Sequence, residues 1–113
     1  MTAQQHRTEE ALGGRLILFV AGDSPRSHRA RANLMPALAD AGITAGWPRE
    51  VDLLVTPGEA LRHGLFASPA LVLTDAHGRS RSVLYGDLSE ASALRRFLAE
   101  AKAVAGSADT WSG

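Results

Sequence analysis

The sequence contains no cysteine, and this absence excludes several classes of protein at once. Without a thiol there is no disulfide framework, no thiolate metal site and no redox mechanism that depends on a sulfur nucleophile. Net charge is also missing, because twelve basic side chains balance twelve acidic ones. No long-range field therefore draws the molecule to nucleic acid or to an anionic membrane, and any recognition by charge must be local.

Long apolar runs are missing as well. The longest, at residues 16–21, is far shorter than the ~20 residues that span a bilayer. Residues 1–14 are polar and lack the apolar core of a signal peptide, so we expect a cytoplasmic protein without a membrane anchor. An apolar fraction of 45% still suffices for one compact domain. We assign that domain to residues 15–105, between a flexible arm at 1–14 and a flexible tail at 106–113.

The first half of the domain is predicted to form a strand, a helix and a second strand. Residues 15–21 are a run of Leu, Ile, Phe and Val typical of a strand buried on both faces. Ser24 and Pro25 predict a helix start, because serine caps free amides and proline at the first position loses no useful donor. Inside that helix Pro36 predicts a kink or a break. Residues 51–55 alternate as the second strand.

The second half predicts a short helix, a hairpin and a long helix. Residues 56–63 begin with the Thr-Pro-Gly-Glu pattern of a capping box. Residues 70–74 and 80–85 are strand-like and are separated by a polar connector with glycine, so we expect them to pair antiparallel. The last helix is expected to follow a cap at Asp87 or Ser89 and to end where the tail begins.

These elements predict an α/β fold of order βαβαββα. A right-handed crossover makes the first two strands parallel, and the hairpin makes the last two antiparallel. The result is a mixed four-stranded sheet with three helices on its faces, which is a thioredoxin-like arrangement.

Residues 18–27 read LFVAGDSPRS. This is the most specific of three blocks in which the sequence resembles the KaiB family of circadian-clock proteins, whose own run has the form LYVAGNTPNS. Residues 51–71 match a second family block in spacing as well as in residue type. Residues 86–89 read GDLS, as the family does before its last helix. The resemblance spans about residues 15–99.

The resemblance implies a bacterial, non-enzymatic protein without a cofactor that docks on the ATPase ring of a KaiC-like clock kinase. It also implies a cis bond before Pro69. Cyanobacterial members switch between a tetrameric ground-state fold and a thioredoxin-like monomer that binds the ring. Where the family commonly has a proline-rich LPPPVR stretch, this chain has an ordinary polar connector at residues 74–80. We therefore predict that this chain rests in the fold-switched, thioredoxin-like form.

Candidate partner-binding residues lie mostly on the first helix. Taken alone, its polar stripe is a solvated face, but ring docking in the family uses the first helix and the second strand, and arginine is a good interface anchor. Trp47 is either a core plug or an aromatic contact. The predicted partner-binding set is Asp23, Arg26, Arg29, Asn33 and Trp47. The predicted structural set is Ser24, Pro25, Pro69, Gly86 and Asp87.

We predict no catalytic and no metal-binding residue. Asp23, Ser27 and His28 suggest a triad by residue type, but neighbours on a helix point in different directions. The four histidines have no ligand-like spacing and are interpreted as solvated side chains.

Other functions stay open at this point. The chain is alternatively a sensory input domain that acts with a histidine kinase, or a stress-signalling adaptor. A thioredoxin-family enzyme is nearly eliminated by the lack of cysteine. Exposed edge strands of a mixed sheet also allow a homo-oligomer.

Overall fold

The computed structural model describes residues 16–43 and 48–112 of the 113-residue chain, with side chains described as far as Val104. The predicted order of four strands and three helices is confirmed. The elements are β1 (Leu16–Val20), α2 (Pro25–Asp40), β2 (Arg49–Asp52), α3 (Gly58–Arg62), β3 (Ala70–Thr74), β4 (Ser80–Tyr85) and α4 (Ala91–Ser112). The arm predicted at residues 1–14 lies outside the described residues.

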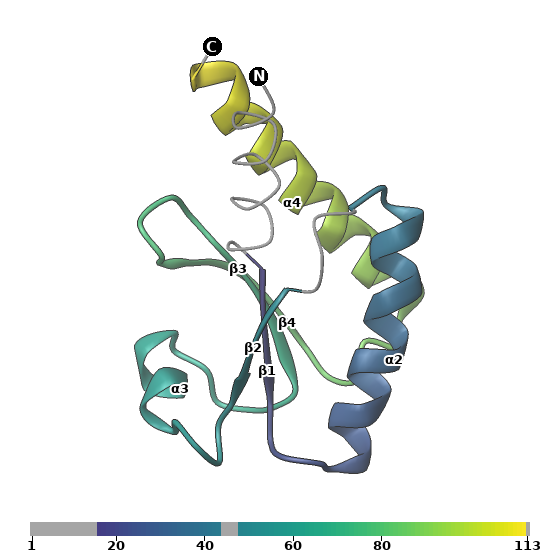
Figure 1. Cartoon of the computed structure of the whole chain (residues 1–113), viewed down its shortest axis with the longest axis vertical. Helices are drawn as coiled ribbons and strands as arrows, with labels where there is room; N and C mark the ends of the chain where they lie inside the picture. Colours follow the sequence, from purple (N-terminus) through teal and green to yellow (C-terminus); the bar gives the residue numbers. More distant parts are fainter. Residues whose placement is uncertain (1–15, 44–47, 113) are drawn as a thin grey trace.

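The four strands form one mixed sheet in the order β2-β1-β3-β4. β1 and β2 are parallel, with Phe19 opposite Val51, as a right-handed crossover through α2 requires. β3 pairs antiparallel with both of its neighbours, β1 and β4. Both predicted pairings are therefore confirmed, and the architecture is compatible with a thioredoxin-like fold (Figure 1).

The two faces of the sheet are covered unequally. α2 and α4 lie side by side over one face, and α3 lies on the other side of the sheet (Figure 1). Leu16, Leu18 and Val20 point into the larger core cluster beneath the two long helices. Ile17 and Phe19 alternate with them and point into a smaller cluster beside α3. β1 is thus buried on both faces, as its continuous apolar run predicts.

The start of α2 follows its sequence signals. The Ser24 hydroxyl accepts the amide of Ser27 at 3.2 Å, and Pro25 is the first helical residue. The helix then runs from Pro25 to Asp40 without interruption, so Pro36 does not break it, and the predicted kink stays a prediction. Leu34 and Leu38, on either side of the proline, are both buried in the core cluster. Their packing holds the helix together across the missing hydrogen bond.

The second strand starts two residues earlier and ends three residues earlier than predicted. It starts at Arg49 and ends at Asp52, because the Asp52 carboxylate accepts the amides of Gly22 at 3.0 Å and Leu54 at 2.9 Å and closes the chain into a turn. The predicted capping box is also absent. Thr56 instead donates its hydroxyl to the carbonyl of Asp52 at 3.3 Å, and no side chain caps α3.

The last helix differs from its prediction at both ends. Glu90, rather than Asp87 or Ser89, provides the cap, since its carboxylate accepts the amide of Ser92 at 3.0 Å. The helix continues to Ser112, so the end predicted near residue 106 is wrong. Gly106, inside the helix, costs only about 1 kcal/mol of helix stability relative to alanine, and the surrounding alanines favour helix.

Within the described residues, no helix is long and apolar enough to cross a membrane.

Candidate functional site

The loop between β1 and α2 contains two serines whose hydroxyls serve the backbone. Ser27 is fully buried, and its Oγ accepts the amide of Ala21 at 3.2 Å. Ser24 donates its hydroxyl to Ser27 Oγ at 2.8 Å while it caps the helix. The Ser27 oxygen is therefore engaged by two donors, and the pair fixes the turn from strand to helix.

Two of the predicted partner contacts lie exposed at the start of α2. The Asp23 side chain is 93% exposed, and its carboxylate lies 4.0 Å from Nε2 of His28, which is too long for a hydrogen bond. Arg26 is exposed, and within the described part of the chain it has no ion-pair partner. Both side chains are free to meet another molecule.

The other two predicted contacts on α2 are tied to the fold. Arg29 Nε donates to the Asp87 carboxylate at 3.0 Å, and Asn33 Nδ2 donates to the Asp87 carbonyl at 2.9 Å. Asn33 is half-buried, so the predicted exposed stripe is shorter than expected. These two bonds hold the loop between β4 and α4 against α2.

Three of the predicted structural residues, Pro69, Gly86 and Asp87, lie at the same loop, whereas Ser24 and Pro25 form the start of α2. The Ser68–Pro69 bond is cis, as the resemblance implies. The amide of Gly86 donates to the carbonyl of Pro69 at 2.9 Å, and Gly86 has a φ of 108°, which glycine adopts readily. Hydrogen bonds from the Ser89 hydroxyl and then from Arg29 hold the pKa of Asp87 below its ordinary value.

An ion pair that the sequence did not reveal joins α2 to the edge strand β2. Arg31 donates from Nε and Nη2 to one carboxylate oxygen of Glu50, at 3.0 Å and 2.7 Å. This hydrogen bonding raises the pKa of Arg31. The two residues are nineteen positions apart in different elements, so no local pattern predicts the pair.

Trp47, the remaining predicted partner contact, lies outside the described residues.

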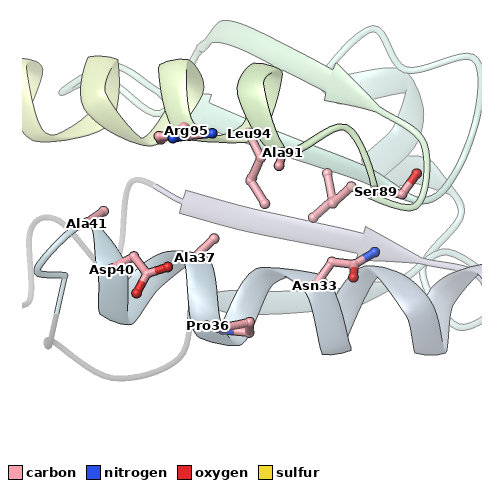
Figure 2. A pocket seen from close by; sticks show the side chains of 10 residues that line it. Asn33, Pro36, Ala37, Asp40, Ala41, Ser89, Ala91, Leu94 and Arg95 are labelled. Carbon is pink, nitrogen blue, oxygen red and sulfur yellow. The ribbon is translucent and has the colours of Figure 1, made fainter.

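A groove of about 430 Å³ runs between α2 and the start of α4 (Figure 2). Such a volume accommodates a small ligand or a side chain of a partner. Its lining is mainly apolar, and two charges of opposite sign lie on opposite helices. Residues that line it include Pro36, Ala37, Asp40, Ser89, Leu94 and Arg95.

The side chain of His63 is buried, although its sequence context suggested a solvated side chain. Only 7% of the side chain is exposed, and its ring lies 5.3 Å from the ring of Phe19 in the core. Its Nδ1 lies 3.0 Å from the hydroxyl of Ser80, and Nε2 lies 3.9 Å from the Glu59 carboxylate. The imidazole thus fastens the end of α3 to the start of β4.

The site offers surface charges and a groove. In the ranges that the structure describes, no three histidine or acidic side chains converge to hold an ion. No family model matches the sequence, and no curated protein matches it significantly, so the family resemblance depends on the three sequence blocks alone.

Proposed function

We propose that this chain is a non-enzymatic, KaiB-like binding module that docks on a KaiC-like ATPase through α2 and β2. The observation that carries the proposal is the Arg31–Glu50 pair, because it joins the helix and the edge strand into one continuous polar surface. Asp23 and Arg26 extend that surface at the helix start with exposed charges of opposite sign. A surface of mixed charge suits a protein partner better than a nucleic acid, which selects an excess of Arg and Lys.

The positions at which thioredoxin-like enzymes hold their cysteines support a binding role. In this chain they are occupied by the turn that contains Ser24 and Ser27, whose hydroxyls bind each other and the backbone. An alcohol without an adjacent base is a poor nucleophile, and the imidazole nearest in sequence faces Asp23 instead. The loop therefore has the chemistry of a rigid helix start.

The thioredoxin-like form is the proposed resting state of the chain. Its support is the β3–β4 hairpin, in which Asp75 accepts the amides of His77 at 2.8 Å and Arg79 at 3.0 Å. The turn also places Gly78 at a φ of 80°, where glycine is strongly preferred. Every local feature of residues 74–80 favours this hairpin, and a proline-rich segment lacks the same amide donors.

The experiment that tests the docking surface compares two arginine variants in binding to an ATP-loaded KaiC-like ATPase. R26A removes a charge from the proposed surface and is expected to weaken binding at least about tenfold, as loss of an interface anchor does. R79A removes the same charge from the β3–β4 turn, which lies far from the start of α2 (Figure 1), and is expected to leave affinity unchanged. Equal weakening by both variants contradicts the assignment of the surface. Binding to a histidine kinase alone contradicts the assignment of the partner.

A further inference from the structure

The groove between α2 and α4 has walls of small side chains over a floor of core leucines. Ala37 of α2 and Ala91 of α4 lie where longer side chains would close the space, and Ala37 and Leu94 point toward each other from the two helices (Figure 2). Leu88 and Leu94 are buried and belong to the larger core cluster of the domain. An apolar group that enters the groove therefore contacts the core and leaves water.

The loop that contains Leu88 is held in place by the fold. The Asp87 carboxylate accepts Arg29 Nε at 3.0 Å, and the Asp87 carbonyl accepts Asn33 Nδ2 at 2.9 Å. Leu88 itself has a φ of 63°, in the left-handed region that a bulky side chain rarely adopts. Backbone strain of this kind persists only where the surroundings hold it, and it is common in ligand clamps. The groove is thus preformed, which lowers the cost of binding.

Two charged residues line the groove from opposite helices. Asp40 lies at the end of α2, and Arg95 lies near the start of α4 (Figure 2). Both residues are exposed, no ion pair joins them, and neither has a hydrogen-bond or ion-pair partner among the residues that the structure describes. A ligand that complements this arrangement has an ammonium at one end, a carboxylate at the other and an apolar body between them.

We propose that the groove binds a short apolar peptide of two or three residues with free ends. Its ammonium pairs with Asp40, its carboxylate pairs with Arg95, and its side chains lie over the leucine floor. The volume of about 430 Å³ is in the range of small-ligand pockets.

The distance between the two helices sets the length of the peptide. The axes of packed helices are about 8–10 Å apart, and an extended chain advances about 3.3–3.6 Å per residue. A dipeptide or tripeptide therefore reaches from one charge to the other. A single amino acid is too short, because its ammonium and carboxylate share one carbon.

This inference goes beyond the proposed docking on an ATPase and does not depend on it. The proposed docking surface consists of Asp23, Arg26 and the Arg31–Glu50 pair, and none of these four residues lines the groove. Peptide binding is also measured without an ATPase. Failure of one proposal therefore leaves the other standing.

NMR titration of the isotope-labelled full chain with free-ended Leu-Leu tests the site. The amides of Ala37, Leu88 and Leu94 are expected to shift and to saturate. A37L fills the groove from α2 and is expected to abolish these shifts. A39L is the matched control, because Ala39 is exposed on the same helix and lies outside the groove.

Capped peptides combined with charge variants assign each end of the ligand. D40N is expected to raise the dissociation constant of free-ended Leu-Leu about threefold, the scale of an exposed ion pair, and to leave that of N-acetylated Leu-Leu unchanged. R95M is expected to weaken the free-ended peptide to the same extent and to leave the C-amidated peptide unchanged. R96M is the control, since Arg96 is the exposed neighbour on α4 that lies outside the groove.

Three results contradict the proposal. The first is a titration in which no amide of the groove shifts at tens of millimolar peptide, and the second is equal weakening by R95M and R96M. The third is a doubly capped peptide that binds as tightly as the free-ended one, because the occupant is then an internal segment of a protein. Thermal melting of each variant verifies the fold, and D40N, at an exposed position, provides the second test if A37L is unfolded.

Discussion

Ser27 is the polar side chain on which the turn into α2 depends most directly. It is fully buried, accepts the Ala21 amide and receives the Ser24 hydroxyl. In the sequence Ser27 lies close to His28 and Asp23, and these three residue types suggest a catalytic triad with a serine nucleophile. Burial decides between the two interpretations, because an oxygen engaged by two internal donors stabilises the loop and is shielded from any substrate.

Replacement of Ser27 tests this structural role. S27A leaves the Ala21 amide without its acceptor and is expected to lower the free energy of unfolding by about 1–3 kcal/mol, the cost of an unsatisfied donor. Urea denaturation at neutral pH measures the change. S92A is the control, because Ser92 is exposed and a surface substitution costs within about 0.5 kcal/mol. Equal stability of S27A and wild type contradicts the role assigned to Ser27.

Arg29 and Asp87 give a second prediction at single residues. The pKa of Asp87 is lowered by the Ser89 hydroxyl and then by Arg29, so R29A is expected to raise that pKa partway toward its ordinary value. An NMR titration of the Asp87 carboxyl carbon measures it directly. R26A serves as the comparison and is expected to leave the Asp87 titration unchanged, because Arg26 lies outside the Asp87 contacts. A titration of Asp87 that is insensitive to R29A rules out the bond between them.

Among the secondary-structure elements, the β3–β4 hairpin shows the strongest local specification. Its two strands match the sequence prediction to the residue, since a glycine and an aspartate mark the turn between two strand-like runs. Asp75 accepts two amides there, and those of Arg79 and then His77 hold its pKa below the ordinary value. Local chemistry therefore suffices to predict the limits of this element.

Acidification tests how much the Asp75 charge contributes to the hairpin. A carboxylate whose pKa is lower in the folded state stabilises the fold above its unfolded pKa of about 3.9, and this stability is lost as the pH falls through the folded pKa. D75N keeps an oxygen acceptor without the charge. We expect D75N to melt at a lower temperature than wild type at pH 7, and the gap to shrink below pH 4. A gap that is the same at both pH values contradicts the electrostatic account.

Elements whose limits depend on distant residues were less predictable. β2 ends early because the Asp52 carboxylate binds Gly22, thirty positions away in the sequence. The sequence predicted a surface position for His63, since no neighbouring residue reveals its contacts with Phe19 and Ser80.

The candidate site was predicted in part. Asp23 and Arg26 lie exposed as predicted, whereas Arg29 and Asn33 are bound to Asp87. Local patterns identify caps and turns, and long-range hydrogen bonds are formed only when the chain is folded.

The whole molecule has two surfaces of different character on opposite faces of its sheet. The start of α2 and the strand β2 carry charges, with the Arg31–Glu50 pair joining the two elements, and the segment around α3 exposes four large apolar side chains. A chain without net charge and without cysteine has little means of acting at a distance or through a thiol. The described surfaces offer shape and local charge, and the proposed binding role rests on these two properties.

The mass of the complex formed with a KaiC-like ATPase, with and without ATP, tests that role most directly. The account predicts that native mass spectrometry of the mixture records an assembly of the ATPase ring with copies of this chain. It also predicts that R26A reduces the occupancy of the ring. A mixture in which the two proteins keep their separate masses in both nucleotide conditions contradicts the account.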